Sequence, residues 1–128
     1  MSKTVKSANY YDLEERTLKF AKDVRQFIKQ ISRTISNIED AKQLNNASGS
    51  VGANYIEANE AISRKDFIHR IKICRKEVKE SRYWLLLINT NNVVYLEEIK
   101  RYLVNEATEL MKIFGSILEK CKEGKISL

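Results

Sequence analysis

Apolar residues recur every three or four positions along most of this chain, the spacing that marks one face of an α-helix. The clearest example runs from Ser63 to Ile88 and contains neither glycine nor proline. Ser63 and Asp66 predict its start, because the hydroxyl can accept an unpaired backbone N–H and the acid favours the positive end of the helix dipole. Seven residues are expected on its core face: Phe67, Ile71, Cys74, Val78, Ser81, Leu85 and Ile88.

Two further helices are predicted near the two ends of the chain. The first runs from about Asp12, which can cap it, to Ile31. The last runs from about Tyr95 to Cys121, where apolar residues again keep the helical period. The asparagine-rich segment 89–94 is the clearest loop in the chain and separates this helix from the one before it.

Residues 36–60 keep a helical period but carry weak helix formers, including Gly49 and Gly52. Each glycine costs roughly 1 kcal/mol relative to alanine in a helix interior. On propensity alone the segment would divide into two pieces with a loop at 45–50. The alternative is one continuous helix whose small residues let a neighbouring backbone approach closely, and which draws its stability from packing.

These elements predict an all-α protein, an antiparallel up-down-up-down four-helix bundle. The chain has no proline and four glycines, which agrees with a few long elements rather than many turns. Its length corresponds to a single domain spanning 1–128 that can bury a core without disulfides or metals. Residues 1–10 and 122–128 are expected to be loose tails.

The charge distribution suggests an acidic partner. The formal net charge is +6 at pH 7, and the excess of Lys and Arg lies on the first and third helical stretches. Lys and Arg neutralise phosphates without reading sequence, and a tyrosine ring can stack on an unpaired base. The alternative is a solvated face partly paired with Glu77 and Glu80. The candidate nucleic-acid-binding residues on the third helix are Lys65, Lys72, Arg75, Lys76, Lys79, Arg82 and Tyr83.

Three apolar residues of the same helix, Ile73, Trp84 and Leu87, fall away from its core face. A helix with only one apolar neighbour would not be expected to place a tryptophan and an isoleucine there. We interpret them as an oligomer interface, with a place in the intramolecular core as the alternative.

Asn54 and Glu57 lie three residues apart on one side of the second predicted helix. A buried carboxylate needs partners, and Arg70, Arg75 or Lys79 of the next helix could supply them. We therefore expect a structural polar network here, with a functional pocket as the alternative. One carboxylate without a second acid, base or nucleophile is a poor catalytic set, so no enzymatic activity is predicted.

Neither a metal nor a cofactor is expected. The single histidine, His69, has no ligand partner four residues later, and Cys74 and Cys121 stand far apart on apolar helical faces. Those cysteines indicate buried thiols in a reducing cytoplasm. The opening residues lack the apolar segment of a signal peptide, and no window approaches a membrane span. We expect a cytoplasmic protein without membrane contact.

Two segments then carry a resemblance to a known family. ASGSVGANYIEA (47–58) followed by SRKDFIHRIKICRKEVKESRYWLLLI (63–88) resembles four-helix-bundle proteins encoded by intervening sequences within bacterial large-subunit ribosomal RNA genes. YDLEERTLKFAKDVRQFI (11–28) is similar to their first helix. Family members are similar in fold to the accessory variability determinant of diversity-generating retroelements, a basic pentameric barrel that binds a reverse transcriptase and nucleic acid.

The resemblance implies a continuous second helix through the glycines and a ring-shaped homopentamer, without an established activity. Gly49, Gly52, Asn54 and Glu57 match the most recognisable positions of the family, which makes the two glycines candidates for close helix packing. Our first hypothesis is a non-enzymatic homo-oligomeric scaffold that binds RNA, DNA or a nucleoprotein through its basic surface. The second is a protein-interaction module that docks a partner enzyme, such as a reverse transcriptase, without touching nucleic acid.

Overall fold

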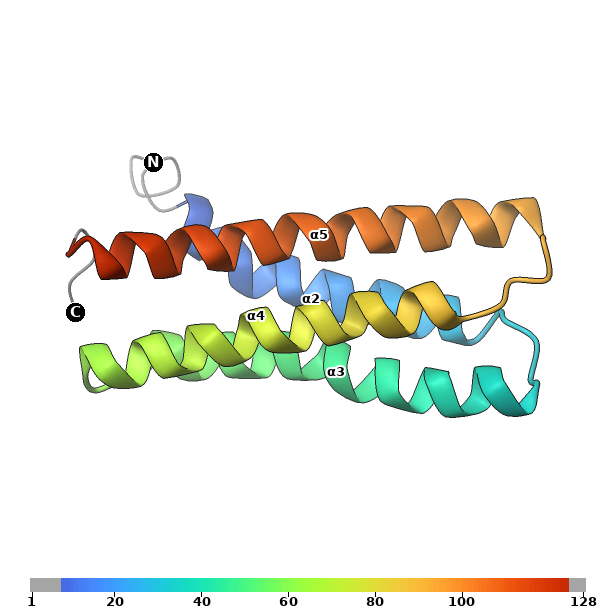
Figure 1. The fold of residues 1–128 in the computed structure, drawn as a ribbon, viewed down its shortest axis with the longest axis horizontal. Coiled ribbons are helices and arrows are strands. Elements are labelled where there is room, and N and C mark those ends of the chain that lie inside the picture. Colours follow the sequence, from blue (N-terminus) through green and yellow to red (C-terminus); the bar gives the residue numbers. More distant parts are fainter. Residues whose placement is uncertain (1–7, 125–128) are drawn as a thin grey trace.

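A computed structural model describes residues 8–124, with side chains from residue 13 onward. Four helices make up this part of the chain: α2 (Ala8–Ile28), α3 (Ile35–Asn59), α4 (Arg64–Leu87) and α5 (Val94–Lys122), labelled as in Figure 1. Successive helices run in opposite directions in Figure 1 and are joined by short links. The predicted all-α four-helix bundle is therefore confirmed.

The first helix is displaced from its predicted position. It begins at Ala8 rather than near Asp12 and ends at Ile28 rather than Ile31, so the prediction that Asp12 caps it was wrong. The reason is that neither glycine nor proline punctuates either end, so the sequence marks no boundary there. Residues 8–10 of the predicted N-terminal tail are helical, whereas 1–7 and 125–128 lie outside the described residues.

Helix α3 runs through both glycines without a break, as the resemblance implied. Thr34 caps its start, where the side-chain oxygen accepts a hydrogen bond from the backbone N–H of Asn37 at 3.1 Å. Leu44, Val51 and Tyr55 are fully buried on one face. The loop that propensity suggested at 45–50 is absent because this apolar face is continuous, and its packing outweighs the weak helix formers.

The predicted start of α4 is confirmed, since Ser63 Oγ accepts a hydrogen bond from the backbone N–H of Asp66 at 3.0 Å. Its seven predicted core residues are all buried. At its other end, Lys100 Nζ of α5 donates to the backbone oxygens of Ile88 at 2.8 Å and Leu86 at 3.2 Å. This lysine binds carbonyls that the helix end leaves without partners.

The four helices enclose one core, in which the Tyr55 and Phe114 rings lie 6.2 Å apart. The contact between α3 and α4 is the most extensive and that between α2 and α5 the least. In Figure 1, α2 runs obliquely to α5, which agrees with the small contact between these two helices.

A buried asparagine ties the two links at one end of the bundle together. Asn37, at 1% exposure, donates through Nδ2 to the backbone oxygens of Ser32 at 3.0 Å and Asn89 at 2.9 Å. Its Oδ1 accepts from the backbone N–H of Asn89 at 3.0 Å. Asn37 thus fixes the α2–α3 link to the α4–α5 link, and Asn91 Nδ2 adds a direct bond between the links by donating to Ser32 Oγ at 2.8 Å.

Candidate nucleic-acid interface

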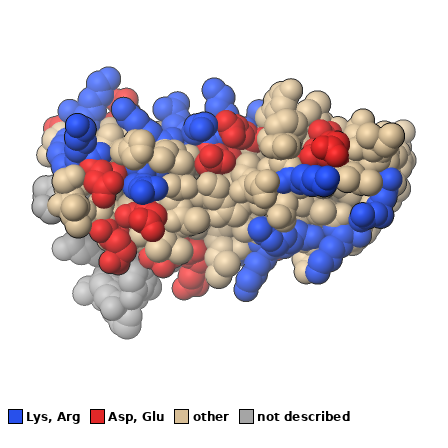
Figure 2. Space-filling view, turned by 90° about the horizontal axis from the view of Figure 1, so that it is seen from below, with Lys and Arg blue, Asp and Glu red and all other residues tan. Residues whose placement is uncertain are grey.

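The outward side of α4 carries an exposed row of cations. Because successive helical residues differ by about 100° in direction, the side opposite the core face is fixed once that face is known. In Figure 2, Lys and Arg gather along the upper edge, where α4 lies, and again at the lower right. Five of the predicted residues are exposed on this side of α4 and are called the α4 stripe below: Lys65, Lys72, Lys76, Lys79 and Tyr83.

No residue of the α4 stripe takes part in an ion pair within the described part of the chain. The salt bridges there join Arg16 to Glu106, Lys19 to Asp23, Lys42 to Glu39 and Lys112 to Glu109. Glu77 and Glu80, the acids expected to compensate the stripe, form none with it. Desolvation raises the pKa of the Glu77 carboxyl, and Glu80 raises it further, whereas Lys76 lowers it.

The two arginines predicted for this surface lie nearer to α5 than the stripe does. Arg82 is half-buried, and its Nε donates to Thr108 Oγ1 of α5 at 2.9 Å. Arg75 is exposed on the same flank of α4. Arg82 therefore serves helix packing, because it stands only about 60° from the centre of the core face on a helical projection.

The apolar residues assigned to an oligomer interface divide into two kinds. Ile73 and Trp84 are half-buried, and Trp84 packs against the core of its own chain. The Trp84 ring also meets Tyr83 edge-on, with centroids 5.0 Å apart. Leu87 is 48% exposed. Trp84 thus has neighbours within its own chain, which leaves Leu87 as the most accessible of the three.

The predicted polar network includes Asn54 but not Glu57. Asn54 Oδ1 accepts from Arg70 at 3.0 Å, and Asn54 Nδ2 donates to the backbone oxygen of Ser50 at 2.9 Å. Glu57 is exposed. Three residues turn a helix by about 300°, so positions 54 and 57 differ by about 60° in direction. This difference carries position 57 to the outer side of α3 while position 54 stays beside α4.

The two glycines lie where α2 crosses α3. A Cβ on Gly52 would stand 2.9 Å from Thr17 Oγ1, and one on Gly49 would stand 3.2 Å from a guanidinium nitrogen of Arg25. Thr17 is itself 1% exposed and bonds back to the Leu13 carbonyl at 2.6 Å. The close approach of α2 to α3 at Gly52 therefore depends on the missing side chain.

The histidine and the two cysteines do not form a metal site in the described part of the chain. His69 is exposed and, with Arg64, Lys65, Ile68 and Lys72, lines a hollow of about 520 Å³ on the first half of α4. Cys74 and Cys121 are buried free thiols, and desolvation raises the pKa of Cys74 to about 12. In the part of the chain with described side chains, no three His, Cys, Asp or Glu residues converge to hold a metal ion.

The sequence model of the 23S rRNA-intervening sequence protein family matches residues 11–116. The chain belongs to this family. The match spans most of α2, all of α3 and α4, and most of α5, so it includes the glycine crossing and the α4 stripe.

A solved structure is similar to this intervening sequence protein along almost its whole length. It is a crystal structure of a protein of unknown function from the S23 ribosomal protein family of Bacteroides thetaiotaomicron, with 28% sequence identity and a TM-score of 0.70. The alignment covers 87% of this chain and 98% of that one. A search of curated proteins finds no match. None of the helices traced between residues 8 and 124 has the length and apolar character to cross a membrane.

A second group of cations was not predicted from the sequence of this family member. They lie on the second half of α2, which contributes the group at the lower right of Figure 2. The uneven charge of the first helical stretch was visible in the sequence, but no residue there was singled out. To predict this surface, one would have to know which helix lies beside α2 on its basic side, and the sequence does not show it.

Proposed function

We propose that this protein is a non-enzymatic homo-oligomeric scaffold, five copies forming a ring, that binds RNA or a nucleoprotein through the α4 stripe. The observation that carries the proposal is that four exposed lysines of one helix face have no ion pair with described residues. Like charges held close together without compensation are unfavourable, and a row of phosphates neutralises them. The counterions that the nucleic acid releases on binding favour the complex further.

Tyr83 adds a second kind of contact to the α4 stripe. The residue is 56% exposed at the end of the row of lysines. An aromatic ring in this position can stack on an unpaired base, which favours single-stranded or looped RNA over a regular duplex. Lysines read phosphate rather than sequence, so we expect weak sequence preference and strong salt dependence.

Titration of a labelled structured RNA over a salt series tests this proposal. Replacing Lys65, Lys72, Lys76 and Lys79 with glutamine is expected to lower the salt slope by roughly 0.7 to 0.9 per lost phosphate contact. The matched control removes four exposed cations of α5 by the same change: Arg101, Lys112, Lys120 and Lys122. Equal loss in both variants, or wild-type binding no tighter than to a neutral polymer, would refute the α4 stripe as the binding surface.

A second function, docking of a partner enzyme without nucleic acid, is favoured by one observation. Leu86 and Leu87 are 50% and 48% exposed, next to Tyr83 near the end of α4. Adjacent apolar side chains at the surface are typical of protein-binding sites. Under this alternative, a protein from the source cell stays bound after nuclease treatment. Recovery of nucleic acid without any protein would count against it.

A further inference from the structure

A groove follows the outer side of the α2–α3 pair, where the α4 stripe does not reach. Three hollows of about 470, 490 and 270 Å³ succeed one another there. The first two share Lys22 and Arg25, and the last two share Ile28 and Asn45. Because neighbouring hollows have lining residues in common, they adjoin one another, and the row of three is called the groove below.

The character of this groove changes along its length. Near the start of α2 it is lined by Glu14 and Glu15 together with the apolar residues Leu18 and Ile56. Toward the other end of α2 the acids disappear from the lining. The remaining half, called the cationic groove below, is lined by Lys22, Arg25, Lys29, Arg33 and Lys42, with the amides of Gln26 and Asn45. Its floor at the far end is apolar and consists of Ile28, Ile31, Ile38 and Ala41.

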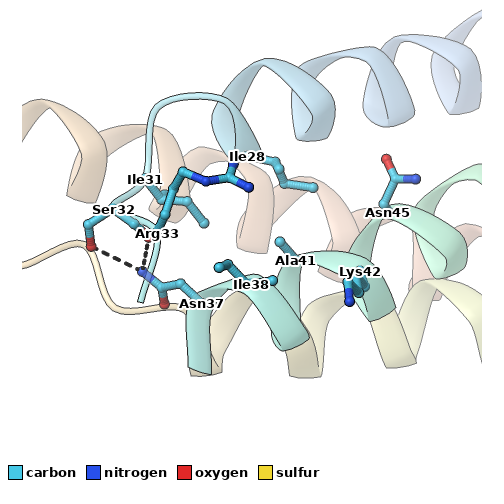
Figure 3. A pocket seen from close by; sticks show the side chains of 9 residues that line it. All are labelled: Ile28, Ile31, Ser32, Arg33, Asn37, Ile38, Ala41, Lys42 and Asn45. Carbon is cyan, nitrogen blue, oxygen red and sulfur yellow. Dashed lines mark hydrogen bonds between the residues drawn. The ribbon is translucent and has the colours of Figure 1, made fainter. Parts of the chain in front are cut away.

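The glycines of α3 line the first hollow, beside Arg25, which this hollow shares with the next one. At Gly49 there is no side chain to fill the space, and the Arg25 guanidinium lies across α3 at that point. Arg25 Nη1 also donates to the Ala21 carbonyl at 3.2 Å, which holds the side chain along its own helix. Figure 3 shows the far end, where Arg33, Lys42 and Asn45 stand around a hollow between α2 and α3.

The cations of this groove are poorly compensated. Of its five cations only Lys42 has an ion pair among the described residues, an exposed one with Glu39 at 3.6 Å. Asp23, the acid closest in sequence to the α2 cations, is paired with Lys19 at 2.7 Å. Lys19 also reaches Tyr102 of α5, so that pair lies on the other flank of α2.

We propose that the cationic groove binds the phosphodiester backbone of a nucleic acid strand, as a second contact separate from the α4 stripe. Lys22, Arg25 and Lys29 recur at intervals of three and four residues, which places their Cα atoms about 4.5 to 6 Å apart along the helix axis. A ladder of evenly spaced cations suits a ligand with evenly spaced anions. This inference extends the proposed function, because it assumes a nucleic acid ligand.

The lining determines how the strand is read. Among the side chains of residues 13–124, no aromatic one lines any of the three hollows, so bases find no ring to stack on there and the contact is to phosphate and sugar. An acidic peptide is a weaker match, because peptide docking relies on apolar anchors. Such anchors would find a place only in the far hollow, beside Ile31, Ile38 and Ala41, since Ile28 is the only described apolar residue lining the middle hollow. The groove therefore adds affinity without sequence preference.

The test compares three triple variants in binding to labelled oligouridine, followed by fluorescence anisotropy over a salt series. The groove variant replaces Lys22, Lys29 and Arg33 with glutamine, and the stripe variant replaces Lys65, Lys72 and Lys76. The control variant replaces Lys112, Lys120 and Lys122 of α5. All nine positions are exposed, so thermal unfolding curves should coincide and any loss of binding reports the surface itself.

The groove variant is expected to lower the salt slope by about 2, since a single strand contributes roughly 0.7 per neutralised phosphate, while the control variant leaves it unchanged. A groove variant that matches the control overturns the inference even where the stripe variant loses binding. Loss in the groove variant alone supports the groove and refutes the α4 stripe. An equal loss of polyglutamate binding would overturn the assignment to phosphate.

Discussion

At the scale of single residues, the geometry of this bundle depends most sharply on Gly52, which has no side chain. Gly52 lies where Thr17 of α2 meets α3, and a Cβ there would approach the Thr17 hydroxyl oxygen to 2.9 Å. Thr17 is buried and bonded to its own helix, so it cannot swing away freely. The contact that would be lost on substitution is the one that sets the distance between α2 and α3.

Replacing Gly52 with alanine is therefore expected to destabilise the protein by about 1–2 kcal/mol, since overpacking outweighs the gain in helix propensity. Gly115 of α5 is the matched control, because nothing lies within 4 Å of a Cβ added there. Gly115→Ala should stabilise by roughly 0.5–1 kcal/mol. Chemical denaturation of both variants measures the difference. A stabilised Gly52→Ala would mean that α2 and α3 approach each other less closely than described.

At the scale of helices, the apolar period predicted the number and order of the elements, but their ends were less visible. The serine cap of α4 is a local signal, and its position was predicted correctly. The first helix lacks such a signal at either end, so its limits at Ala8 and Ile28 were missed. Helix α3 is the opposite case, because its local signals favoured a break at 45–50 and only the buried face prevented one.

Asn37 joins the two links at one end of the bundle, and no local pattern in the sequence revealed this contact. It is one of many asparagines in the sequence, and its burial arises only when two chain reversals meet at one end of the bundle. Replacing it with alanine removes the bonds that its amide donates to Ser32 and Asn89 and leaves the Asn89 N–H without its partner, an expected loss of about 2–3 kcal/mol.

Asn46 provides the control for that substitution. It lies on the same helix and is exposed, so Asn46→Ala is expected to be neutral or slightly stabilising through helix propensity. Urea unfolding of the two variants, under the same conditions, gives the comparison. If Asn37→Ala unfolds at the same urea concentration as Asn46→Ala, the asparagine does not hold the two links together.

At the scale of the whole molecule, the candidate surfaces differ in how far a sequence can reveal them. The α4 stripe belongs to one helix, so its direction follows from the core face of that helix alone. Arg82 bonds to Thr108 and Glu57 is exposed, because small differences in direction decide which neighbour a side chain meets. The cationic groove needs two helices, and no sequence pattern states that α2 and α3 leave a hollow between them.

Assembly is the property of the whole molecule on which the scaffold proposal rests. The family resemblance implies a ring of five, and the exposed apolar residues of α4 offer it a surface. Trp84 is a poor probe of that surface because it packs against its own core, so its removal would also affect folding. Leu87, at 48% exposure, can be changed with little effect on the single chain.

We expect light scattering of the wild-type protein to give about five times the chain mass of 14.9 kDa, and Leu87→Glu to shift the distribution toward single chains. The control is Ile56→Glu, an equally exposed apolar residue at 51% on the α2–α3 side, which should leave the assembly intact. If Ile56→Glu breaks the assembly and Leu87→Glu does not, subunits meet across α2 and α3, where a strand could no longer reach the cationic groove. A wild-type mass near that of one chain would rule out the ring, and both cationic surfaces could then be tested on the monomer.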